Sequence, residues 1–187
     1  MIQPKICITA AGVLVWEEKV LLVKHKKLGI WLNPGGHVEA DELPHHAAER
    51  EFFEETGVKV VAYTSPVKSS IPFDETMKLG AAVAPSETPF LPLPISCNLH
   101  WVSHENYLLR TQQGEKMHKN SVWQRGCEQH CNFLYLVRPV AGLDLVENQS
   151  ETLGIGWFTS QQIGKLEIKE NILTEIVLAL QLAKTSC

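Results

Sequence analysis

The sequence predicts an α/β fold organised as a single domain. Four patterns carry this prediction. Residues 7–23 have the pattern of a β-hairpin, residues 42–56 that of a helix, and residues 132–138 that of a buried strand, followed from about residue 169 by an amphipathic helix. With 187 residues, 44% of them hydrophobic, the chain is long enough to bury one core.

The predicted strands differ in their residue composition. Small, β-branched and apolar residues fill 7–16 and 20–23 with a short polar segment between them, which is typical of a hairpin. The run 133–137 is apolar and β-prone throughout, as expected of a central strand. A further short strand is expected at 154–158, and Thr159 after it is a candidate cap for a brief helix.

The helix at 42–56 has recognisable ends and a buried side. Asp41 is a suitable N-cap residue, and Gly57 is a residue at which the helix is expected to stop. Ala48 and Phe52, four residues apart, form an apolar row that is expected to pack on the sheet.

The middle of the chain, at about 63–119, is expected to be a long Pro-rich insertion or loop of the single domain 1–187. Six prolines between residues 65 and 95 make a continuous helix or central strand improbable there. Long loops in compact domains are usually binding loops, small inserted subdomains or disordered segments, and we expect substrate choice to depend on this one. Its aromatic residues can stack on a base, although anchoring of the loop is the more common role: Phe73, Phe90, Trp101 and Tyr107.

Three glutamates lie on one face of the predicted helix. Glu51, Glu54 and Glu55 are spaced i, i+3 and i+4, so their carboxylates are neighbours and repel one another. Such a cluster is tolerable on a fully solvated face or around bound cations, and the spacing favours cations. Hard divalent ions such as Mg²⁺ prefer oxygen ligands and are commonly held by carboxylates together with substrate phosphates.

A glycine turn precedes this helix. Gly35 and Gly36 allow the backbone to approach a ligand closely, and the carbonyl of Gly35 is a candidate ligand for the same cations. The basic residues Lys24, Lys26 and Lys27 arrive just before the turn and are candidate phosphate contacts. A solvated strand end is the alternative explanation for these lysines.

The stretch from the glycine turn to the end of the helix resembles the Nudix box. That pattern is Gly, five residues, Glu, seven residues, Arg-Glu-apolar, one residue, Glu-Glu, one residue, Gly-apolar, and the chain fills every defined position with Gly36, Glu42, Arg50, Glu51, Phe52, Glu54, Glu55, Gly57 and Val58. The resemblance implies an α/β/α sandwich with a mixed β-sheet and a requirement for Mg²⁺ or Mn²⁺. It also implies hydrolysis of a phosphoanhydride in a nucleoside diphosphate linked to another moiety, such as a nucleoside triphosphate or ADP-ribose, by water attack at phosphorus.

The resemblance and the side-chain chemistry together suggest roles within the box. Glu51, Glu54 and Arg50 are the candidate catalytic residues. Arg50 cannot act as a base, because its guanidinium keeps its proton in proteins. We expect it to hold Glu42 or Glu51 in place through paired hydrogen bonds.

The general base is left open between the box and a later loop. Glu51 is the candidate within the box, and Glu151 and Glu147 are the candidates on the loop. The alternative for the two loop residues is that they are surface acids before a strand.

Two other functions remain open. A ligand-sensing or partner-binding module can keep this fold without catalysis, although binding alone does not need clustered glutamates. A diphosphate-handling isomerase of the same fold needs a cysteine and a glutamate that face one another in a pocket, and Cys97 or Cys127 is a candidate for that cysteine.

Five scattered cysteines give poor support for a disulfide framework. Cys127, His130 and Cys131 raise the question of a zinc site, with His118 as a further ligand. The spacing is unusual and a second ligand pair is missing, so ordinary thiols beside a strand are the favoured interpretation.

The net charge of −4 and the absence of a basic stripe argue against a large nucleic-acid partner. We therefore expect a small nucleotide-type substrate. Without an apolar run long enough to cross a bilayer, or a signal peptide, the chain is expected to have no membrane partner and to be cytoplasmic, as a monomer or homodimer.

Overall fold

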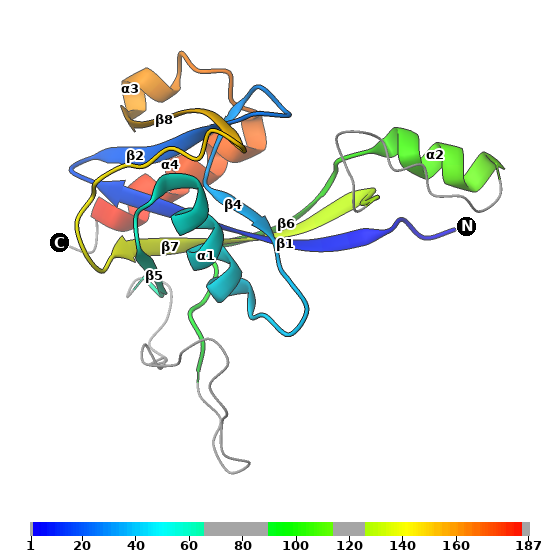
Figure 1. Cartoon of the computed structure of the whole chain (residues 1–187), viewed down its shortest axis with the longest axis horizontal. Coiled ribbons are helices and arrows are strands. Elements are labelled where there is room, and N and C mark those ends of the chain that lie inside the picture. The colour runs from blue at the N-terminus through cyan, green and yellow to red at the C-terminus, as the bar shows by residue number, and fades with distance from the viewer. Residues whose placement is uncertain (1, 66–89, 114–125, 185–187) are drawn as a thin grey trace, which may run out of the picture.

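The structure, a computed structural model, describes residues 2–65, 90–113 and 126–184 (Figure 1). Its centre is an eight-stranded sheet. The strands are β1 (Ile6–Trp16), β2 (Lys19–His25), β3 (Trp31–Leu32), β4 (Gly35–His37), β5 (Val60–Tyr63), β6 (Ser96–Trp101), β7 (Gln129–Pro139) and β8 (Thr152–Thr159).

The sheet is mixed, as expected. The main path runs β3-β2-β1-β7-β5, while β4 pairs with β1, β6 with β7 and β8 with β2. Strands β1 and β2 form the predicted antiparallel hairpin, with Val15 opposite Val20. Strand β7 is central and runs parallel to β1, with Cys7 opposite His130 and continuing to Leu14 opposite Val137. The first and the last third of the chain thus meet side by side in the middle of the sheet.

Helices cover both faces of this sheet, which gives the predicted α/β/α sandwich. The helices are α1 (Pro44–Thr56), α2 (His104–Gln113), α3 (Ser160–Ile163) and α4 (Glu170–Lys184). Helix α1 packs Phe52 into the core on one face, and α4 packs Ile176 into the core on the other (Figure 1). Among the described residues, none of the helices combines the length and hydrophobicity needed to cross a membrane.

The start of α1 differs from the expectation. The helix begins at Pro44 rather than Glu42, and Leu43 is its N-cap, without a side-chain hydrogen bond. The N-cap expected at Asp41 is wrong, because Asp41 has a φ of 62° and lies in a turn before the helix. The end is as predicted, since Gly57 has a φ of 74° and its N–H donates to the carbonyl of Phe53.

The region at 63–119 contains more regular structure than the predicted loop. Strand β6 pairs antiparallel with β7, from Ser96 opposite Leu134 to Trp101 opposite Gln129, and α2 follows it. The prolines end at residue 94, so they do not interrupt the strand. Two residues considered above, Phe73 and His118, lie outside the described residues.

The cysteines also differ from the expectation of ordinary thiols. Cys7 and Cys127 form a disulfide across 120 residues of sequence, with their Cα atoms 5.8 Å apart. The parallel pairing of β1 with β7 brings these two distant positions together. Cys97 and Cys131 are free thiols, with Sγ atoms 3.9 Å apart. The cluster of Cys127 and Cys131 considered for zinc is therefore not formed.

Candidate active site

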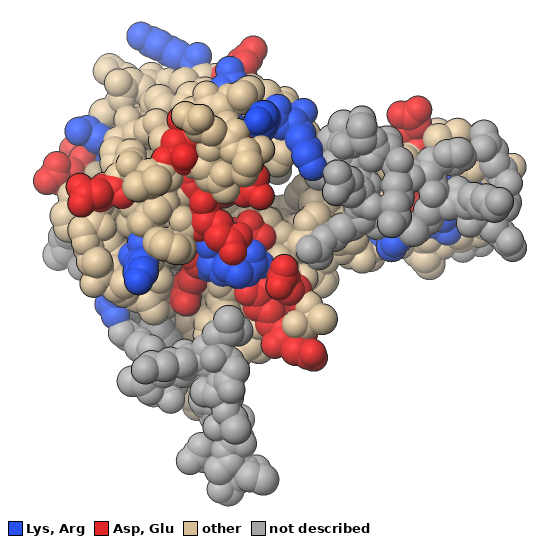
Figure 2. All heavy atoms as spheres, viewed as in Figure 1, with Lys and Arg blue, Asp and Glu red and all other residues tan. Residues whose placement is uncertain are grey.

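The acidic side of α1 faces away from the core. Ala48 and Phe52 are fully buried against the sheet, as predicted from their spacing. Glu51 and Glu54 project from the other side of the helix, with side chains 16% and 46% exposed. Figure 2 shows acidic side chains gathered around a cationic group on the face of the molecule that carries α1. Glu55 lies deeper, at 4% exposure.

Arg50 connects this cluster to the segment before the helix. Its guanidinium donates from Nε and Nη2 to the two carboxylate oxygens of Glu42, at 2.9 and 3.0 Å. Nη1 donates to Glu51 at 2.9 Å and to Glu54 at 3.2 Å, and Nη2 also donates to the carbonyl of His37 at 3.0 Å. A guanidinium has five N–H donors, and each has a contact here. The paired hydrogen bonds to Glu42 agree with the expected positioning role.

The glycine turn lies directly against the carboxylates. Strand β4 pairs with β1, and the N–H of Gly35 donates to Oε2 of Glu55 at 3.1 Å. A side chain at Gly36 would collide with the carboxylate of Glu51. Close approach, rather than a left-handed backbone, is therefore the reason for glycine at position 36.

Burial and mutual repulsion perturb Glu55 strongly. Desolvation raises its pKa to about 8, and this rise outweighs the opposing effect of the Gly35 N–H. The negative charges of Glu51, Glu151 and Glu54 contribute further to the rise. A buried carboxyl group held among like charges is an energetically poor arrangement for the protein alone.

Two further acids of the box, Glu51 and Glu42, have pKa values that are shifted in opposite directions. Burial raises the pKa of Glu51 in spite of its ion pair with Arg50. The pKa of Glu42 is lowered, chiefly by its hydrogen bonds to Arg50. Glu42 is thus held as a charged anchor, whereas Glu51 and Glu55 are carboxylates whose charge is not fully compensated. Oxygen donors of this kind fit a hard divalent cation such as Mg²⁺ or Mn²⁺.

The two loop glutamates have different surroundings. The carboxylate of Glu151 accepts a hydrogen bond from the amide of Asn148 at 3.2 Å, and its charge contributes to the raised pKa of both Glu51 and Glu55. Glu147 instead accepts a hydrogen bond from the hydroxyl of Thr152 at 3.1 Å. Of the two candidates for a loop base, the structure brings Glu151 to the carboxylate cluster.

The candidate phosphate contacts are spread along the end of β2 and the turn after it. The ammonium of Lys26 donates to the carbonyl of Gln149 at 2.9 Å, and its backbone N–H donates to the carbonyl of Glu151. Lys24 is 3.9 Å from the carboxylate of Glu167. For Lys27, the backbone N–H donates to the ring of His25. Lys26 is the member of this group tied to the loop that carries Glu151.

A cavity of about 340 Å³ opens on the other side of the glycine turn. Gly35, Gly36 and His37 contribute to its wall, so the turn separates it from the carboxylates of α1. Its polar lining includes Thr9, Asn98, His100, Asn132, Lys169 and Glu175. Trp101 also lines it, whereas Phe90 and Tyr107, considered above for stacking, are not among the lining residues.

Sequence reasoning missed the polar groups of this cavity. The carboxylate of Glu175 is buried and accepts hydrogen bonds from Ser96 at 2.5 Å and from Asn98 at 2.7 Å. Burial raises the pKa of Glu175. A polar residue in the apolar stripe of the last helix is the signal that identifies Glu175. The contribution of Asn98 depends on strand pairing that is not visible in the sequence.

The cysteines do not meet the requirement of the isomerase alternative. The lining of the 340 Å³ cavity contains no cysteine. Cys127 is bonded to Cys7, and Cys97 lies beside Cys131. Among the described residues of this cavity, a cysteine facing a glutamate is therefore absent.

Comparisons with known proteins point to one family. Residues 8–179 match the family model for the NUDIX domain. Phosphatase NudJ of Escherichia coli strain K12 is 37% identical over 86 residues, which is 45% of this chain and 49% of NudJ. The chain thus spans about half the length of the curated relatives it matches.

Solved structures show the same fold. A NUDIX family hydrolase from Clostridium perfringens is 27% identical, with a TM-score of 0.65 and coverage of 94% of this chain and 97% of that one. An ADP-ribose pyrophosphatase from Streptococcus suis 89-1591 is 18% identical, with a TM-score of 0.52 and coverage of 97% and 93%. The domain match over most of the chain, together with the complete box on α1, establishes that this chain belongs to the Nudix hydrolase family.

Proposed function

We propose that the protein is a metal-dependent pyrophosphohydrolase that cleaves a phosphoanhydride in a nucleoside diphosphate linked to another moiety. The observation that supports this most strongly is the arrangement on α1. Arg50 fixes Glu42, Glu51 and Glu54 in one array, and Glu55 lies beside it with a pKa raised to about 8. A protein that only binds a partner has no need for such a costly cluster.

Glu51, Glu54 and Glu55 would hold Mg²⁺ or Mn²⁺, with the carbonyl of Gly35 as a further candidate ligand. When bound, such an ion neutralises pyrophosphate charge and lowers the pKa of a water molecule. A cation bound beside Glu55 favours the charged carboxylate and so lowers its pKa. Because burial raises the pKa of Glu55 in the protein alone, a bound cation would relieve this unfavourable state, which supports a cation at this position.

The chain's own residues have separate tasks in the reaction. Glu151 is the proposed general base and takes a proton from the attacking water. Of the two candidate loop carboxylates, it is the one whose charge contributes to the raised pKa of Glu51 and Glu55. The water oxygen bonds to phosphorus while the bridging P–O bond breaks. The bridging oxygen leaves with the second phosphoryl group, which gives a nucleoside monophosphate and a phosphorylated remainder.

The cavity beside the glycine turn suits the nucleoside end of the substrate. Its volume of about 340 Å³ and its mixture of apolar walls with a few fixed polar groups are typical of small-ligand sites. Asn98 lines this cavity, and its amide donates from Nδ2 to Glu175 at 2.7 Å while its Oδ1 lies 2.7 Å from Nδ1 of His100. Lys26, which is hydrogen-bonded to the loop that carries Glu151, remains a proposed phosphate contact, together with Lys24 and Lys27.

The test is a hydrolysis panel with Mg²⁺. Nucleoside triphosphates, ADP-ribose, dinucleoside polyphosphates, nucleotide sugars and coenzyme A would be assayed, with products separated by chromatography. We expect at least one compound to be cleaved at the phosphoanhydride, with the activity lost in Glu51→Gln. If all compounds were cleaved no faster by the wild type than by this variant, the protein would instead be a catalytically silent binding module.

A further inference from the structure

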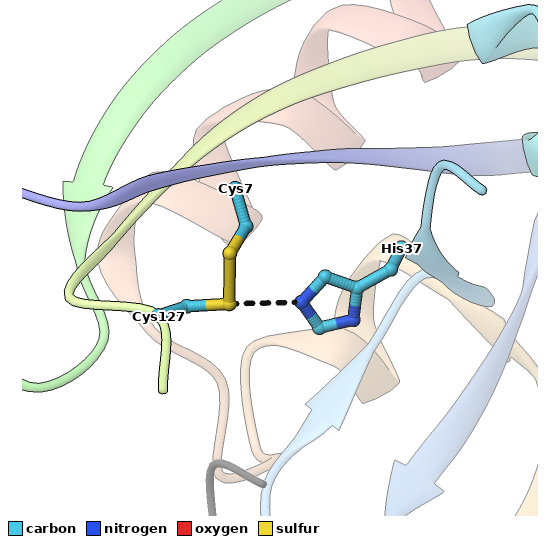
Figure 3. Close-up of side chains that lie close together, drawn as sticks. All are labelled: Cys7, His37 and Cys127. Atoms are coloured by element: carbon cyan, nitrogen blue, oxygen red, sulfur yellow. Dashed lines mark hydrogen bonds between the residues drawn. A yellow bond between two sulfur atoms is a disulfide. The ribbon is translucent and has the colours of Figure 1, made fainter. Parts of the chain in front are cut away.

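Two cysteines and a histidine from three separate segments meet beside the glycine turn. Cys7 lies in β1, Cys127 directly precedes β7, and His37 ends β4 (Figure 3). Cys7 and Cys127 are joined by a disulfide, and Nε2 of His37 lies 3.3 Å from Sγ of Cys127. Each residue offers one potential ligand atom, and these three atoms all lie within 4.8 Å of one another.

Sheet register explains why the side chains of Cys7 and His37 share a face. Cys7 and Thr9 are two residues apart in β1 and therefore point to the same side of the sheet. Thr9 pairs with His37, and Cys7 pairs with His130. The ring of His130 packs edge-on against that of His37, with centroids 4.9 Å apart, and both residues line the 340 Å³ cavity. The sulfur pair thus contacts His37, a residue of the cavity wall, although neither cysteine lines the 340 Å³ cavity itself.

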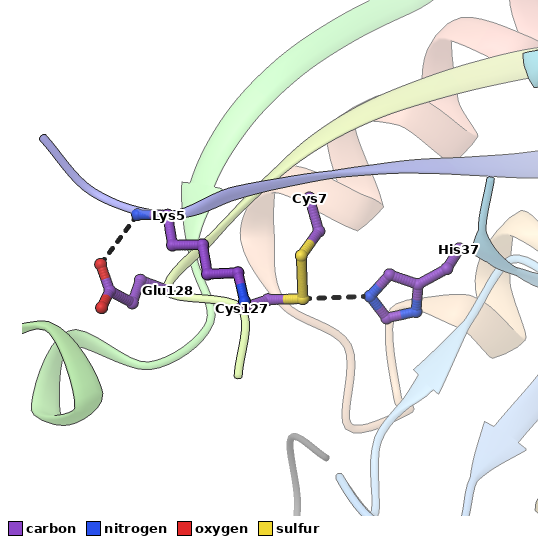
Figure 4. The surroundings of a disulfide bond; sticks show 5 residues. All are labelled: Lys5, Cys7, His37, Cys127 and Glu128. Carbon is purple, nitrogen blue, oxygen red and sulfur yellow. Dashed lines mark hydrogen bonds between the residues drawn. A yellow bond between two sulfur atoms is a disulfide. The ribbon is translucent and has the colours of Figure 1, made fainter. Parts of the chain in front are cut away.

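Contacts other than the sulfur–sulfur bond hold Cys127 beside Cys7. The backbone N–H groups of Glu128 and Gln129 donate to the carbonyl of Lys5 at 3.0 and 3.1 Å. In return, the backbone N–H of Lys5 donates to the Glu128 carboxylate at 2.8 Å (Figure 4). These hydrogen bonds do not require the disulfide, so the two sulfur atoms remain neighbours after reduction.

A buried ion pair adds to this anchoring. Glu128 is 1% exposed and pairs through both oxygens with Arg110 of α2, at 2.6 and 2.8 Å. Arg110 also donates to the carbonyl of Gln3, in the segment before β1. The strand ends that carry Cys7 and Cys127 are therefore fixed to one another by side chains as well as by the backbone.

We propose that, after reduction of the Cys7–Cys127 disulfide, the two cysteines and Nε2 of His37 bind one Zn²⁺ ion. Thiolate and imidazole are preferred Zn²⁺ ligands, and tetrahedral geometry with bonds of about 2.3 Å to sulfur and 2.0 Å to nitrogen separates ligand atoms by roughly 3.3–3.8 Å. The three atoms are already within 4.8 Å of one another, so small side-chain rotations are sufficient.

The disulfide is converted to the metal site in two steps. A dithiol reductant transfers two electrons and two protons to the disulfide, which breaks the S–S bond and leaves two thiols and an oxidised reductant. Zn²⁺ then displaces the two thiol protons, which pass to solvent. Disulfide and metal site are therefore alternative uses of the same sulfur atoms. Three protein ligands leave a fourth position for water or a substrate atom.

This site is chemically distinct from the carboxylates of α1. Soft thiolates select zinc over magnesium, whereas the glutamate cluster selects hard ions. The proposal does not depend on the hydrolytic function, although the two sites are connected. The carbonyl of His37 accepts a hydrogen bond from Arg50, so the residue that would bind zinc through its ring also supports the catalytic array through its backbone.

The proposal can be tested with Co²⁺, which replaces Zn²⁺ and reports its ligands by absorption. Full-length protein reduced with an excess of dithiothreitol, then freed of reductant under anaerobic conditions, would be titrated with Co²⁺. We expect one equivalent to produce a thiolate-to-cobalt charge-transfer band that Zn²⁺ abolishes. Oxidised protein is expected to give no such band, and carboxylate-bound Co²⁺ cannot produce it.

Matched variants assign the ligands. Cys7→Ser is expected to lose the band, with Cys127→Ser as the second variant if Cys7→Ser does not fold, and His37→Ala is expected to weaken Co²⁺ binding. The control is Cys97→Ser with Cys131→Ser, which removes the free thiols of the described residues and is expected to keep the band. Absence of the band in reduced wild type, its loss in the control, or persistence of the disulfide in excess dithiothreitol would overturn the proposal.

Discussion

The guanidinium of Arg50 forms a two-pronged ion pair with the carboxylate of Glu42, from Nε to Oε1 at 2.9 Å and from Nη2 to Oε2 at 3.0 Å. Glu42 precedes α1 and Arg50 lies within it, so this pair closes the loop that begins at the glycine turn. The same guanidinium reaches Glu51 and Glu54. One cation thus sets the positions of three carboxylates.

Glu42→Gln is expected to lower both stability and activity. The Glu42 side chain is 6% exposed, and hydrogen bonds to charged groups contribute about 1.5–3 kcal/mol, so the free energy of unfolding should fall by about that amount. Loss of the positioning pair should lower kcat about 10- to 100-fold. Urea denaturation and steady-state kinetics measure the two effects. The control is Glu170→Gln on the exposed start of α4, and equal behaviour of the two variants would contradict the assigned role.

Glu54→Gln is expected to lower turnover by about two orders of magnitude or more while the protein stays folded. The side chain is 46% exposed, so its replacement should not disturb the core. The substitution does remove the negative charge of a proposed cation ligand. Glu49→Gln on the same helix is the matched control, because its side-chain oxygen can still accept from the N–H of Ala62. Kinetics with Mg²⁺ and circular dichroism distinguish the outcomes, and nearly normal turnover of Glu54→Gln would rule out the proposed role.

Stability without divalent cations is expected to fall as the pH rises from about 6.5 to about 8. This interval lies above the range in which the buried His45 and His130, whose pKa values burial lowers to about 4 and about 3, act in the opposite direction. Glu55 has a pKa of about 8 in the folded protein against 4.5 ordinarily, so over this interval the folded state binds more protons than the unfolded state. By linkage, the free energy of unfolding then decreases with pH. Glu51, whose pKa is also raised, acts in the same direction.

Urea midpoints across this pH range, with a chelator and with Mg²⁺, measure the effect. Glu55→Gln should flatten the slope, since an amide does not titrate, and Mg²⁺ should flatten it in the wild type. A slope that is the same in Glu55→Gln as in the wild type would show that another group is responsible.

Glu151→Gln is expected to lower kcat about 10²- to 10⁴-fold, the range typical of a lost general base. Glu147→Gln is the matched control, four residues earlier on the same loop, and its oxygen can still accept from Thr152. We expect little effect from the control. A large loss in Glu147→Gln, or nearly normal kcat in Glu151→Gln, would shift the base to the other loop residue or to Glu51.

Asn98→Leu is expected to raise KM for the nucleotide substrate more than it changes kcat. The substitution removes an amide of the cavity lining that contacts Glu175 and His100, whereas the carboxylates of α1 are untouched. Asn171 lines the same cavity at the start of α4, and Asn171→Ala tests whether the loss of any polar side chain from the lining raises KM. A fall in kcat at unchanged KM would contradict a binding role for the cavity.

Structural features that depend on residue spacing within one helix can be predicted from the sequence. The i, i+3, i+4 positions of Glu51, Glu54 and Glu55 and the αL residue Gly57 are properties of one helix, and the structure agrees with them. The helix start is less predictable, because Leu43 caps α1 without a side-chain hydrogen bond, and the more favourable Asp41 lies in the preceding turn.

Features that depend on distant pairing are not visible in the sequence. Cys7 and Cys127 meet because β1 and β7 are parallel neighbours, and the cavity amide of Asn98 is positioned by the pairing of β6 with β7. The choice of Glu151 over Glu147 likewise depends on how their loop folds beside α1. These relationships need the tertiary arrangement, whereas the box needs only one turn and one helix.

The most direct test of the account is a titration of the purified protein with Mn²⁺, followed by the electron paramagnetic resonance signal of the free ion. We expect the wild type to take up Mn²⁺, more tightly when a nucleotide is present, and the combined variant Glu51→Gln, Glu54→Gln, Glu55→Gln to lose this uptake. If the wild type bound no Mn²⁺ under either condition, or if the combined variant bound it equally well, the glutamate cluster on α1 would not be a metal site.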